Sequence, residues 1–433
     1  MRRLQRGWVC PHPRGIARAT PRMTARWFAI PLWQRVLTGL ALGVLLGALW
    51  PEGAAAIRLV GELFVRLIRM LVVPVVLVTI AAGIAALGDP RRLGPIGGRA
   101  LGWFAATTLV AVALGMACGL LLQPGAGVRF GGVAPHALGM PPTPAEQLLA
   151  IAPTNIVEAL ARGDMLAIIL VAVLLGTGSV VAGEAGRPVT ALLQGLAAVL
   201  LQVVRGVMEL TPFGVAALVA NAVASGGAAV FVHVGWLALA VVLGALVQLA
   251  FHAALLRLVA RRGVARFFRG SADALVVAFS TASSSATLPV ALRVATDRLG
   301  IERAIAGTVL PLGASVGKDG TALYVGLLGQ FALQSLGVVP DLTMLVVMWL
   351  TGALAAFGTA PVPSASLFML AAMLAAVGVS AEQTALVVGL VLPFDRLLDM
   401  TRTVPSASAN LTVTALVARA EERAVLAAPP PAG

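Results

Sequence analysis

The feature that most constrains this chain is a series of long apolar stretches separated by short arginine-rich segments. A helix crosses a bilayer with about 20 apolar residues, and we expect such spans near 28–50, 57–87 and 101–122, followed by apolar stretches within 145–260. Hydrophobic residues make up 59% of the chain and charged residues 11%, whereas soluble domains carry about a quarter charged residues. A water-soluble fold could not cover this much apolar side chain, so the pattern predicts an all-α polytopic membrane protein.

The distribution of charge gives the topology. The net charge of +13 would also fit a nucleic-acid-binding protein, but the arginines lie between apolar stretches and not on one continuous face, which argues against nucleic acid as a partner. Arginine-rich segments occur in the N-terminal tail and at 91–92, 261–269, 293–303 and 419–423. Connections almost free of Lys and Arg occur at 51–57, 331–341 and 376–383. The positive-inside rule then predicts two cytoplasmic termini and about eight spans.

Two segments do not fit simple spans. The stretch 271–292 lies between two cytoplasmic segments, and 342–375 lies between two external ones, so each must enter and leave on the same side. Two hairpins from opposite faces are typical of an inverted repeat. We therefore expect about eight transmembrane helices plus two re-entrant helical hairpins.

The tip of the first hairpin, residues 280–289, holds six hydroxyl residues followed by Pro289. Irregular backbone within a bilayer is tolerated where it lines a cavity, and hydroxyls with free N–H groups at a helix N-terminus suit a carboxylate ligand. A packing face of small residues is the alternative, which explains one or two serines better than six. The second tip, residues 358–366, has two prolines that stop a helix. A kinked helix is the alternative interpretation of this segment.

Between the hairpins, glycines flank a charged pair, Lys318 and Asp319. Lys318 is the only lysine of the chain and Tyr324 the only tyrosine. Ionisable groups inside a bilayer are costly, so we predict a functional role for this pair. An inert ion pair that fills a polar core is the alternative.

The last apolar stretch carries a polar stripe. Asp395, Asp399, Arg402, Ser406 and Asn410 share one face at helical spacing, and such a stripe in a membrane helix faces a cavity. Arg402 offers a bidentate fork to a carboxylate, and Asp399 accepts from an ammonium group. Together they predict an acidic amino acid as the ligand. The alternative is that Asp399 and Arg402, one turn apart, pair with each other.

These segments resemble the dicarboxylate/amino acid:cation symporter family, which includes glutamate transporters and archaeal aspartate-transporting relatives. The motifs that carry the likeness are 66–74, 153–155, 283–289, 319–324 and 399–403. The resemblance implies a homotrimer in a bacterial inner membrane, with a transport domain that moves like an elevator. It divides the chain into a disordered basic cytoplasmic tail (1–27), two scaffold spans (28–88), a transport-domain span (100–122), two scaffold spans and a transport-domain span (145–260), a transport core (266–420) and a second cytoplasmic tail (421–433).

The resemblance also implies roles for individual residues. Arg402 would bind the side-chain carboxylate of the substrate and Asp399 its amino group. The other substrate-binding positions are Ser283, Ser284, Ser285, Thr321, Val362 (an external gate), Thr403 and Ser406. The positions of the coupling cation, Na⁺ or H⁺, are Thr107, Thr108, Ser315, Gly317, Lys318, Asp319, Thr359 and Asn410.

Several of these positions depart from the family pattern. The motif Asn-Met-Asp-Gly reads Gly-Lys-Asp-Gly at 317–320, the sodium-binding aspartate is Asn410, and the gate glycines are Ser364 and Ser366. We infer that Lys318 supplies a tethered cation where relatives bind sodium and pairs with Asp319, because an unpaired buried charge is costly.

The coupling ion stays open. A buried lysine deprotonates readily, so sodium coupling, proton coupling and uncoupled exchange all remain possible. We expect no organic cofactor and no resident metal. The four histidines, His12, His136, His233 and His252, have no ligand spacing, and we predict isolated polar or interfacial side chains.

Three other functions would each fit part of the sequence. A membrane serine hydrolase would use Ser283–Ser285 with Lys318 as a Ser–Lys dyad, but it leaves Asp399 and Arg402 unexplained. A C4-dicarboxylate or neutral amino-acid carrier is the second rival; Arg402 argues against neutral substrates, and Asp399 favours amino acids over plain dicarboxylates. The third is a degenerate family member without a substrate, acting as an anion pathway or scaffold.

Overall fold

The computed structural model describes residues 30, 32–87, 94–128, 152–163, 165–226, 229–357 and 365–427. Every regular element in these ranges is a helix, which confirms the all-α class. The predicted tail at 1–27 and residues 358–364 of the second tip lie outside the described residues. The predicted boundary at 420 is not a helix end, because the last helix continues to Ala427.

One group of helices packs around α4. Its members are α2 (Leu32–Leu49), α3 (Pro51–Ala56), α4 (Arg58–Leu87), α7 (Ile156–Arg162), α8 (Met165–Val181), the 3₁₀ turn η1 (Gly183–Gly186), α9 (Arg187–Met208) and α10 (Thr211–Gly226). Helices α8, α9 and α10 all contact α4, and α2 lies along α10. Glycines permit this close approach: a Cβ atom at Gly43 would lie 2.5 Å from the carbonyl oxygen of Ala216.

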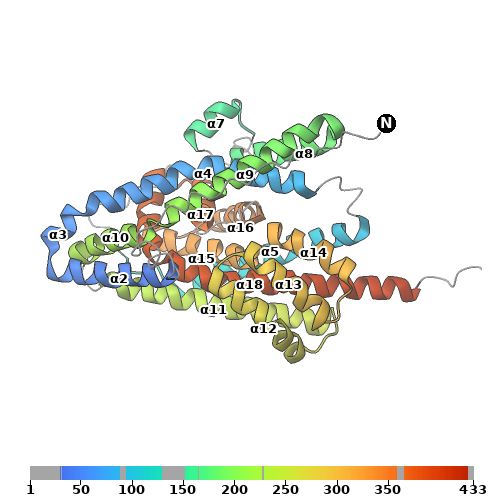
Figure 1. The fold of residues 1–433 in the computed structure, drawn as a ribbon. Coiled ribbons are helices and arrows are strands. Elements are labelled where there is room, and N and C mark those ends of the chain that lie inside the picture. The colour runs from blue at the N-terminus through green and yellow to red at the C-terminus, as the bar shows by residue number, and fades with distance from the viewer. Residues whose placement is uncertain are drawn as a thin grey trace, which may run out of the picture.

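A second group packs around α15 and α18. Its members are α5 (Gly94–Leu122), α11 (Ala229–Leu258), α12 (Val264–Thr281), α13 (Ser284–Asp297), α14 (Arg303–Val316), α15 (Asp319–Ser335), α16 (Leu342–Phe357), α17 (Ala365–Ala375) and α18 (Ala381–Ala427). Figure 1 shows α4, α8 and α9 along one side and α11 and α12 along the other, with α15 and α18 between them. The division into scaffold and transport domains stays a prediction.

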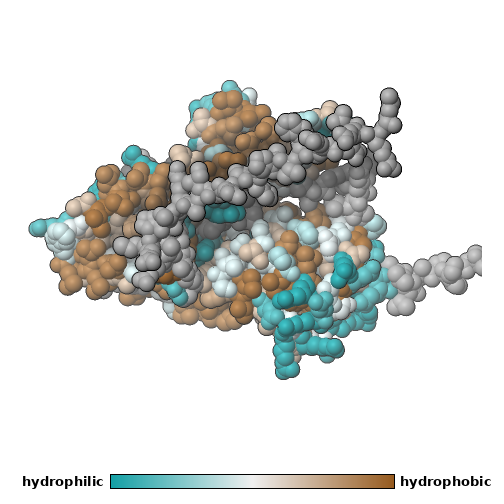
Figure 2. Space-filling model, viewed as in Figure 1, coloured by the Kyte–Doolittle hydropathy of each residue, from teal (hydrophilic) through white to brown (hydrophobic). Residues whose placement is uncertain are grey.

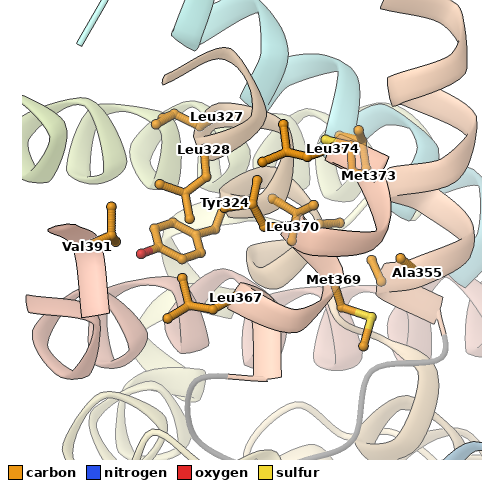
Figure 3. Close-up of a cluster of buried hydrophobic side chains, with 14 of the residues drawn as sticks. Tyr324, Leu327, Leu328, Ala355, Leu367, Met369, Leu370, Met373, Leu374 and Val391 are labelled. Carbon is orange, nitrogen blue, oxygen red and sulfur yellow. The ribbon is translucent and has the colours of Figure 1, made fainter. Parts of the chain in front are cut away.

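Helix α15 lies at the centre of the second group. It contacts α5, α11, α16, α17 and α18, and all of its residues are buried except Thr321 and Gln334. Figure 3 shows the Tyr324 ring among leucines of α15 and α17, with its hydroxyl at the edge of this apolar cluster. The Tyr324 hydroxyl therefore marks the boundary between this apolar cluster and the polar side chains of the candidate site.

The surface fits a membrane. In the described part, three helices are long and apolar enough to cross a bilayer, at Pro95–Leu122, Gly183–Met208 and Val232–Leu258, and five more apolar helices are shorter. Apolar side chains cover much of the surface around α2 and the start of α4, whereas hydrophilic residues gather over α12 (Figure 2). Large exposed apolar areas mark contact with lipid or with other proteins. The count of about eight spans stays a prediction.

Both expected hairpins appear as packed helix pairs. Helix α12 contacts α13, and only Ala282 and Ser283 connect them. Ala282 adopts a left-handed φ of 50°, which ends α12, and Ser283 begins α13. Helices α16 and α17 also pack together. Their re-entry into a bilayer stays a prediction.

Candidate functional site

Two helix breaks meet the middle of α18. The first is the turn between α12 and α13, and the second lies between α14 and α15, where Gly317 and Lys318 interrupt the helix. Helices α13, α14 and α15 all contact α18. The N-terminal N–H groups of α13 and α15 have no partners within their own helices. One of them, Gly320 N–H, donates to Ser406 Oγ of α18 over 3.1 Å.

Arg402 is the centre of the polar stripe on α18. It is 2% exposed, and its Nε and Nη2 atoms donate to Asp399 Oδ1 over 3.0 and 2.9 Å. Its Nη1 donates to Asp395 Oδ1 over 3.2 Å and to Ser366 Oγ of α17. The guanidinium also lies 4.4 Å from the ring centroid of Tyr324, a cation–π contact. The structure therefore shows the Asp399–Arg402 pair that the sequence left as an alternative, within a larger network.

This network leaves two buried carboxylate oxygens without a hydrogen-bond partner, Asp395 Oδ2 and Asp399 Oδ2. Asp399 Oδ2 is buried and has no hydrogen-bond partner, although Arg396 Nη1 lies 3.8 Å away. An ionised carboxylate oxygen is an acceptor only. An amino group of a substrate would therefore find a free lone pair on Asp399 beside the guanidinium of Arg402.

Lys318 does not pair with Asp319, and the expected ion pair is wrong. The side chain is 4% exposed, and its ammonium donates to Ser284 Oγ over 3.0 Å and to the carbonyl oxygen of Ala314 over 2.8 Å. Among the described residues it forms no ion pair. The lysine turns back along α14 because the Ala314 carbonyl and the tip serine accept its hydrogens there. Its charge therefore lies at the tip of the α12–α13 hairpin.

Asp319 instead forms a separate buried cluster. Its Oδ1 accepts from Thr107 Oγ1 and Thr108 Oγ1 of α5, over 3.1 and 3.3 Å. Its Oδ2 accepts from Gln248 Nε2 of α11 over 3.2 Å and lies 3.1 Å from His252 Nε2 of the same helix. The structure therefore brings together three predicted coupling residues and adds two that the sequence analysis missed.

His252 corrects one expectation. It is fully buried and hydrogen-bonded at both ring nitrogens, because Nδ1 lies 3.1 Å from Ser408 Oγ. It is therefore neither isolated nor interfacial. A signal was present in the sequence: Gln248 and His252 are four residues apart in an otherwise apolar stretch, which puts two polar side chains on one helical face inside a membrane.

The other predicted positions vary in their surroundings. Ser283 accepts from Ala286 N–H as the N-cap of α13, Ser284 is buried, and Ser285 is exposed. Thr403 Oγ1 donates to the Asp399 carbonyl over 2.6 Å, Ser315 Oγ donates to the Pro311 carbonyl over 3.3 Å, and Thr321 is half-buried. Thr359 and Val362 lie outside the described residues.

Asn410 faces the break between α14 and α15. Its buried Oδ1 has no hydrogen-bond partner. A Cβ atom added at Gly317 would lie 2.1 Å from this oxygen and 2.8 Å from the ring of Phe104. Residue 317 is therefore a glycine because the asparagine side chain and the phenylalanine ring fill the space that a side chain would need.

The fold and site together define a helical membrane protein with a buried cluster of charged side chains between broken helices. The family model of the sodium:dicarboxylate symporter family matches residues 32–420, so the chain belongs to this family. The resemblance read from the motifs is thereby confirmed. The chain is a multi-pass transport protein and not an enzyme, so the Lys318–Ser284 hydrogen bond does not serve a hydrolase.

Three relatives illustrate the range of the family. The proton/sodium-glutamate symport protein of Bacillus caldotenax is 32% identical over 410 residues, which cover 90% of this chain and 94% of the relative. The C4-dicarboxylate transport protein of Anaeromyxobacter sp. (strain K) is 32% identical over 419 residues, 92% of each chain. The proton/glutamate-aspartate symporter of Escherichia coli (strain K12) is 32% identical over 414 residues, 90% of this chain and 93% of the relative.

Proposed function

We propose that this chain is a secondary active symporter of an acidic amino acid, aspartate or glutamate, or of a related C4-dicarboxylate. The observation that carries the proposal is the buried guanidinium of Arg402, which is held by Asp395 and Asp399 beside the hydroxyl-rich tip of the α12–α13 hairpin. A planar guanidinium matches a carboxylate in a bidentate geometry. Relatives named for glutamate, aspartate and C4-dicarboxylates support the same substrate class.

The substrate would take its polar contacts from three elements. Arg402 binds the side-chain carboxylate, and Asp399 Oδ2 accepts from the amino group. The second carboxylate lies at the N-terminus of α13, where Ser284 and the Lys318 ammonium donate and the helix dipole favours an anion.

The second hairpin would act as the external gate. Ser366 Oγ of α17 accepts a hydrogen bond from Arg402 Nη1, and a substrate carboxylate needs the same donor. Movement of α17 away from α18 would release this N–H group and admit the substrate. The rest of the proposal follows the resemblance: a homotrimer of the bacterial inner membrane with both termini cytoplasmic, whose transport domain carries the site across the bilayer like an elevator.

Sodium sites would be partly lost. Lys318 supplies a tethered positive charge beside the substrate carboxylate, and Asn410 removes a negative charge near the α14–α15 break. Both changes lower the demand for a free cation, because each leaves less negative charge to neutralise.

A C4-dicarboxylate is the second candidate substrate. One observation favours it: both Arg402 Nε and Nη2 donate to Asp399 Oδ1, so the aspartate is partly satisfied without an amino group. Asp399 Oδ2, which has no hydrogen-bond partner, favours the amino acid.

Competition for uptake distinguishes the two candidate substrates, an acidic amino acid and a C4-dicarboxylate. Purified protein is reconstituted into proteoliposomes that contain unlabelled aspartate. Entry of labelled aspartate is then measured with excess glutamate, succinate or alanine outside. We expect glutamate to compete strongly and alanine not at all. Stronger competition by succinate than by glutamate would reassign the site to C4-dicarboxylates, and absence of any uptake would favour a degenerate family member.

A further inference from the structure

We infer that His252 and Gln248 complete the coordination of the buried Asp319 carboxylate, so that this position needs no sodium ion. The assignment rests on the proposed function, because it concerns which ion that transporter requires. It replaces Lys318 by His252 as the residue that satisfies Asp319.

The first support is the saturation of the carboxylate. A carboxylate offers about four lone-pair positions on its two oxygens. Each oxygen of Asp319 has two donors within 3.3 Å: Thr107 and Thr108 on Oδ1, Gln248 and His252 on Oδ2. Asp319 is 0% exposed. Both carboxylate oxygens are therefore engaged by protein donors, and the Thr107 hydroxyl also lies 3.3 Å from the Phe104 carbonyl oxygen.

The second support is the orientation of the imidazole. The His252 Nε2 atom lies 3.1 Å from both Asp319 Oδ2 and Gln248 Nε2, and because a carboxylate only accepts hydrogen bonds, we assign a hydrogen to this nitrogen. At the other side of the ring, Nδ1 is 3.1 Å from Ser408 Oγ of α18. The hydroxyl fixes the ring and keeps its N–H group directed at the carboxylate, as outer partners orient a histidine ligand in metal sites.

The third support comes from the neighbouring positions. A cation at the α14–α15 break would need negatively charged or carbonyl oxygens. Residue 317 has no side chain, and residue 410 offers an amide whose Oδ1 lies within 3 Å of where Cβ atoms of Gly313 and Gly317 would be. Asn410 thus places a neutral amide where a carboxylate would attract a cation, and protein donors already engage both oxygens of Asp319.

The inference predicts a gain of sodium dependence when the donors are removed. In His252→Leu, one lone pair of a buried anion loses its partner, which is costly, and a sodium ion can take that place. His252→Gln is the matched control, because it keeps an N–H donor at the same position. Gln248→Leu removes the other donor to Oδ2 and serves if His252→Leu does not fold.

The experiment measures thermal unfolding of the purified proteins in sodium chloride and in choline chloride at equal concentration, with uptake of labelled aspartate under both conditions. We expect the wild type and His252→Gln to unfold at the same temperature in both salts. We expect His252→Leu or Gln248→Leu to unfold at a lower temperature in choline and to recover saturably with sodium, since an ion that binds only the folded state stabilises it.

Two results would overturn the inference. One is a saturable stabilisation of the wild type by sodium that disappears in Asp319→Asn. The other is the absence of a sodium response in both donor-removing variants. The unfolding measurement does not depend on the substrate, so a protein that shows the expected sodium pattern but takes up no acidic substrate would refute the proposed function and leave this inference standing.

Discussion

The guanidinium of Arg402 lies over the ring of Tyr324, with its central carbon 4.4 Å from the ring centroid. Both side chains also bind the same atom, Asp395 Oδ1, over 3.2 Å from Arg402 and 2.9 Å from the tyrosine hydroxyl. The only tyrosine of the chain therefore fixes the arginine in two ways, through its ring and through the aspartate.

This relationship separates the two parts of the tyrosine. Tyr324→Phe keeps the ring and removes one donor to Asp395, so we expect the KM for aspartate to rise about tenfold, for a loss of about 1.4 kcal/mol. Tyr324→Leu also removes the cation–π contact, which contributes about 2 kcal/mol when desolvated, and should raise KM further. Phe331→Leu, in the same helix but in the apolar core, is the control: it should lower Tm and leave KM unchanged. Equal KM values for Tyr324→Phe and Tyr324→Leu would contradict the role of the ring.

Ser366 competes with the substrate for Arg402. In Ser366→Ala the Nη1 group loses a partner before the substrate binds, and a buried unsatisfied donor costs about 1–3 kcal/mol. We expect a lower Tm without substrate and a KM for aspartate that falls several-fold. Steady-state uptake and thermal unfolding measure the two effects. A raised KM would show that the hydroxyl instead binds the substrate.

Sequence analysis identified the helix breaks well because their residue types are unusual inside a membrane. The hydroxyl-rich tip at 280–289 predicted the turn at Ala282 and Ser283, and the glycines around Lys318 and Asp319 lie where the structure interrupts the helix before α15. These features depend on local backbone chemistry, which a single sequence displays. The direction of the Lys318 side chain could not be predicted, since it depends on two acceptors, Ser284 and Ala314, whose positions are set by packing.

Lys318→Met tests the tethered cation, because methionine is similar in length and uncharged. We expect uptake of labelled aspartate without sodium to fall at least about tenfold, the effect of losing one charged hydrogen-bond donor. Added sodium should restore part of the activity. Arg293→Gln, an exposed arginine of α13, controls for the change of net charge. If the wild type already depends steeply on sodium, Lys318 does not supply a cation.

Gly317→Ala tests the packing of Asn410 and Phe104 against the helix break. The added Cβ atom would lie 2.1 Å from Asn410 Oδ1, and overpacking costs about 1–3 kcal/mol. We expect Tm to fall, and the second change Asn410→Ala to recover part of the loss. Gly102→Ala in α5, where a Cβ atom meets nothing within 4 Å, should leave Tm unchanged or raise it, since alanine favours helix by about 1 kcal/mol. Equal effects at both glycines would contradict the crowding.

Only part of the cluster around Asp319 could be predicted from the sequence. Thr107, Thr108 and Asp319 were predicted as one group because the family resemblance grouped them. Gln248 and His252 lie on α11, about 70 residues before Asp319 in the chain and outside the motifs. Their contact with Asp319 depends on the packing of α11 against α15, which no local pattern reports.

Counterflow of labelled aspartate, measured in proteoliposomes for the wild type, Arg402→Gln and Arg293→Gln, tests the central claim most directly. The claim is that the guanidinium of Arg402 binds the substrate carboxylate. We expect counterflow by the wild type and by Arg293→Gln, and its loss in Arg402→Gln although that protein remains folded. Undiminished aspartate counterflow by Arg402→Gln would contradict the claim.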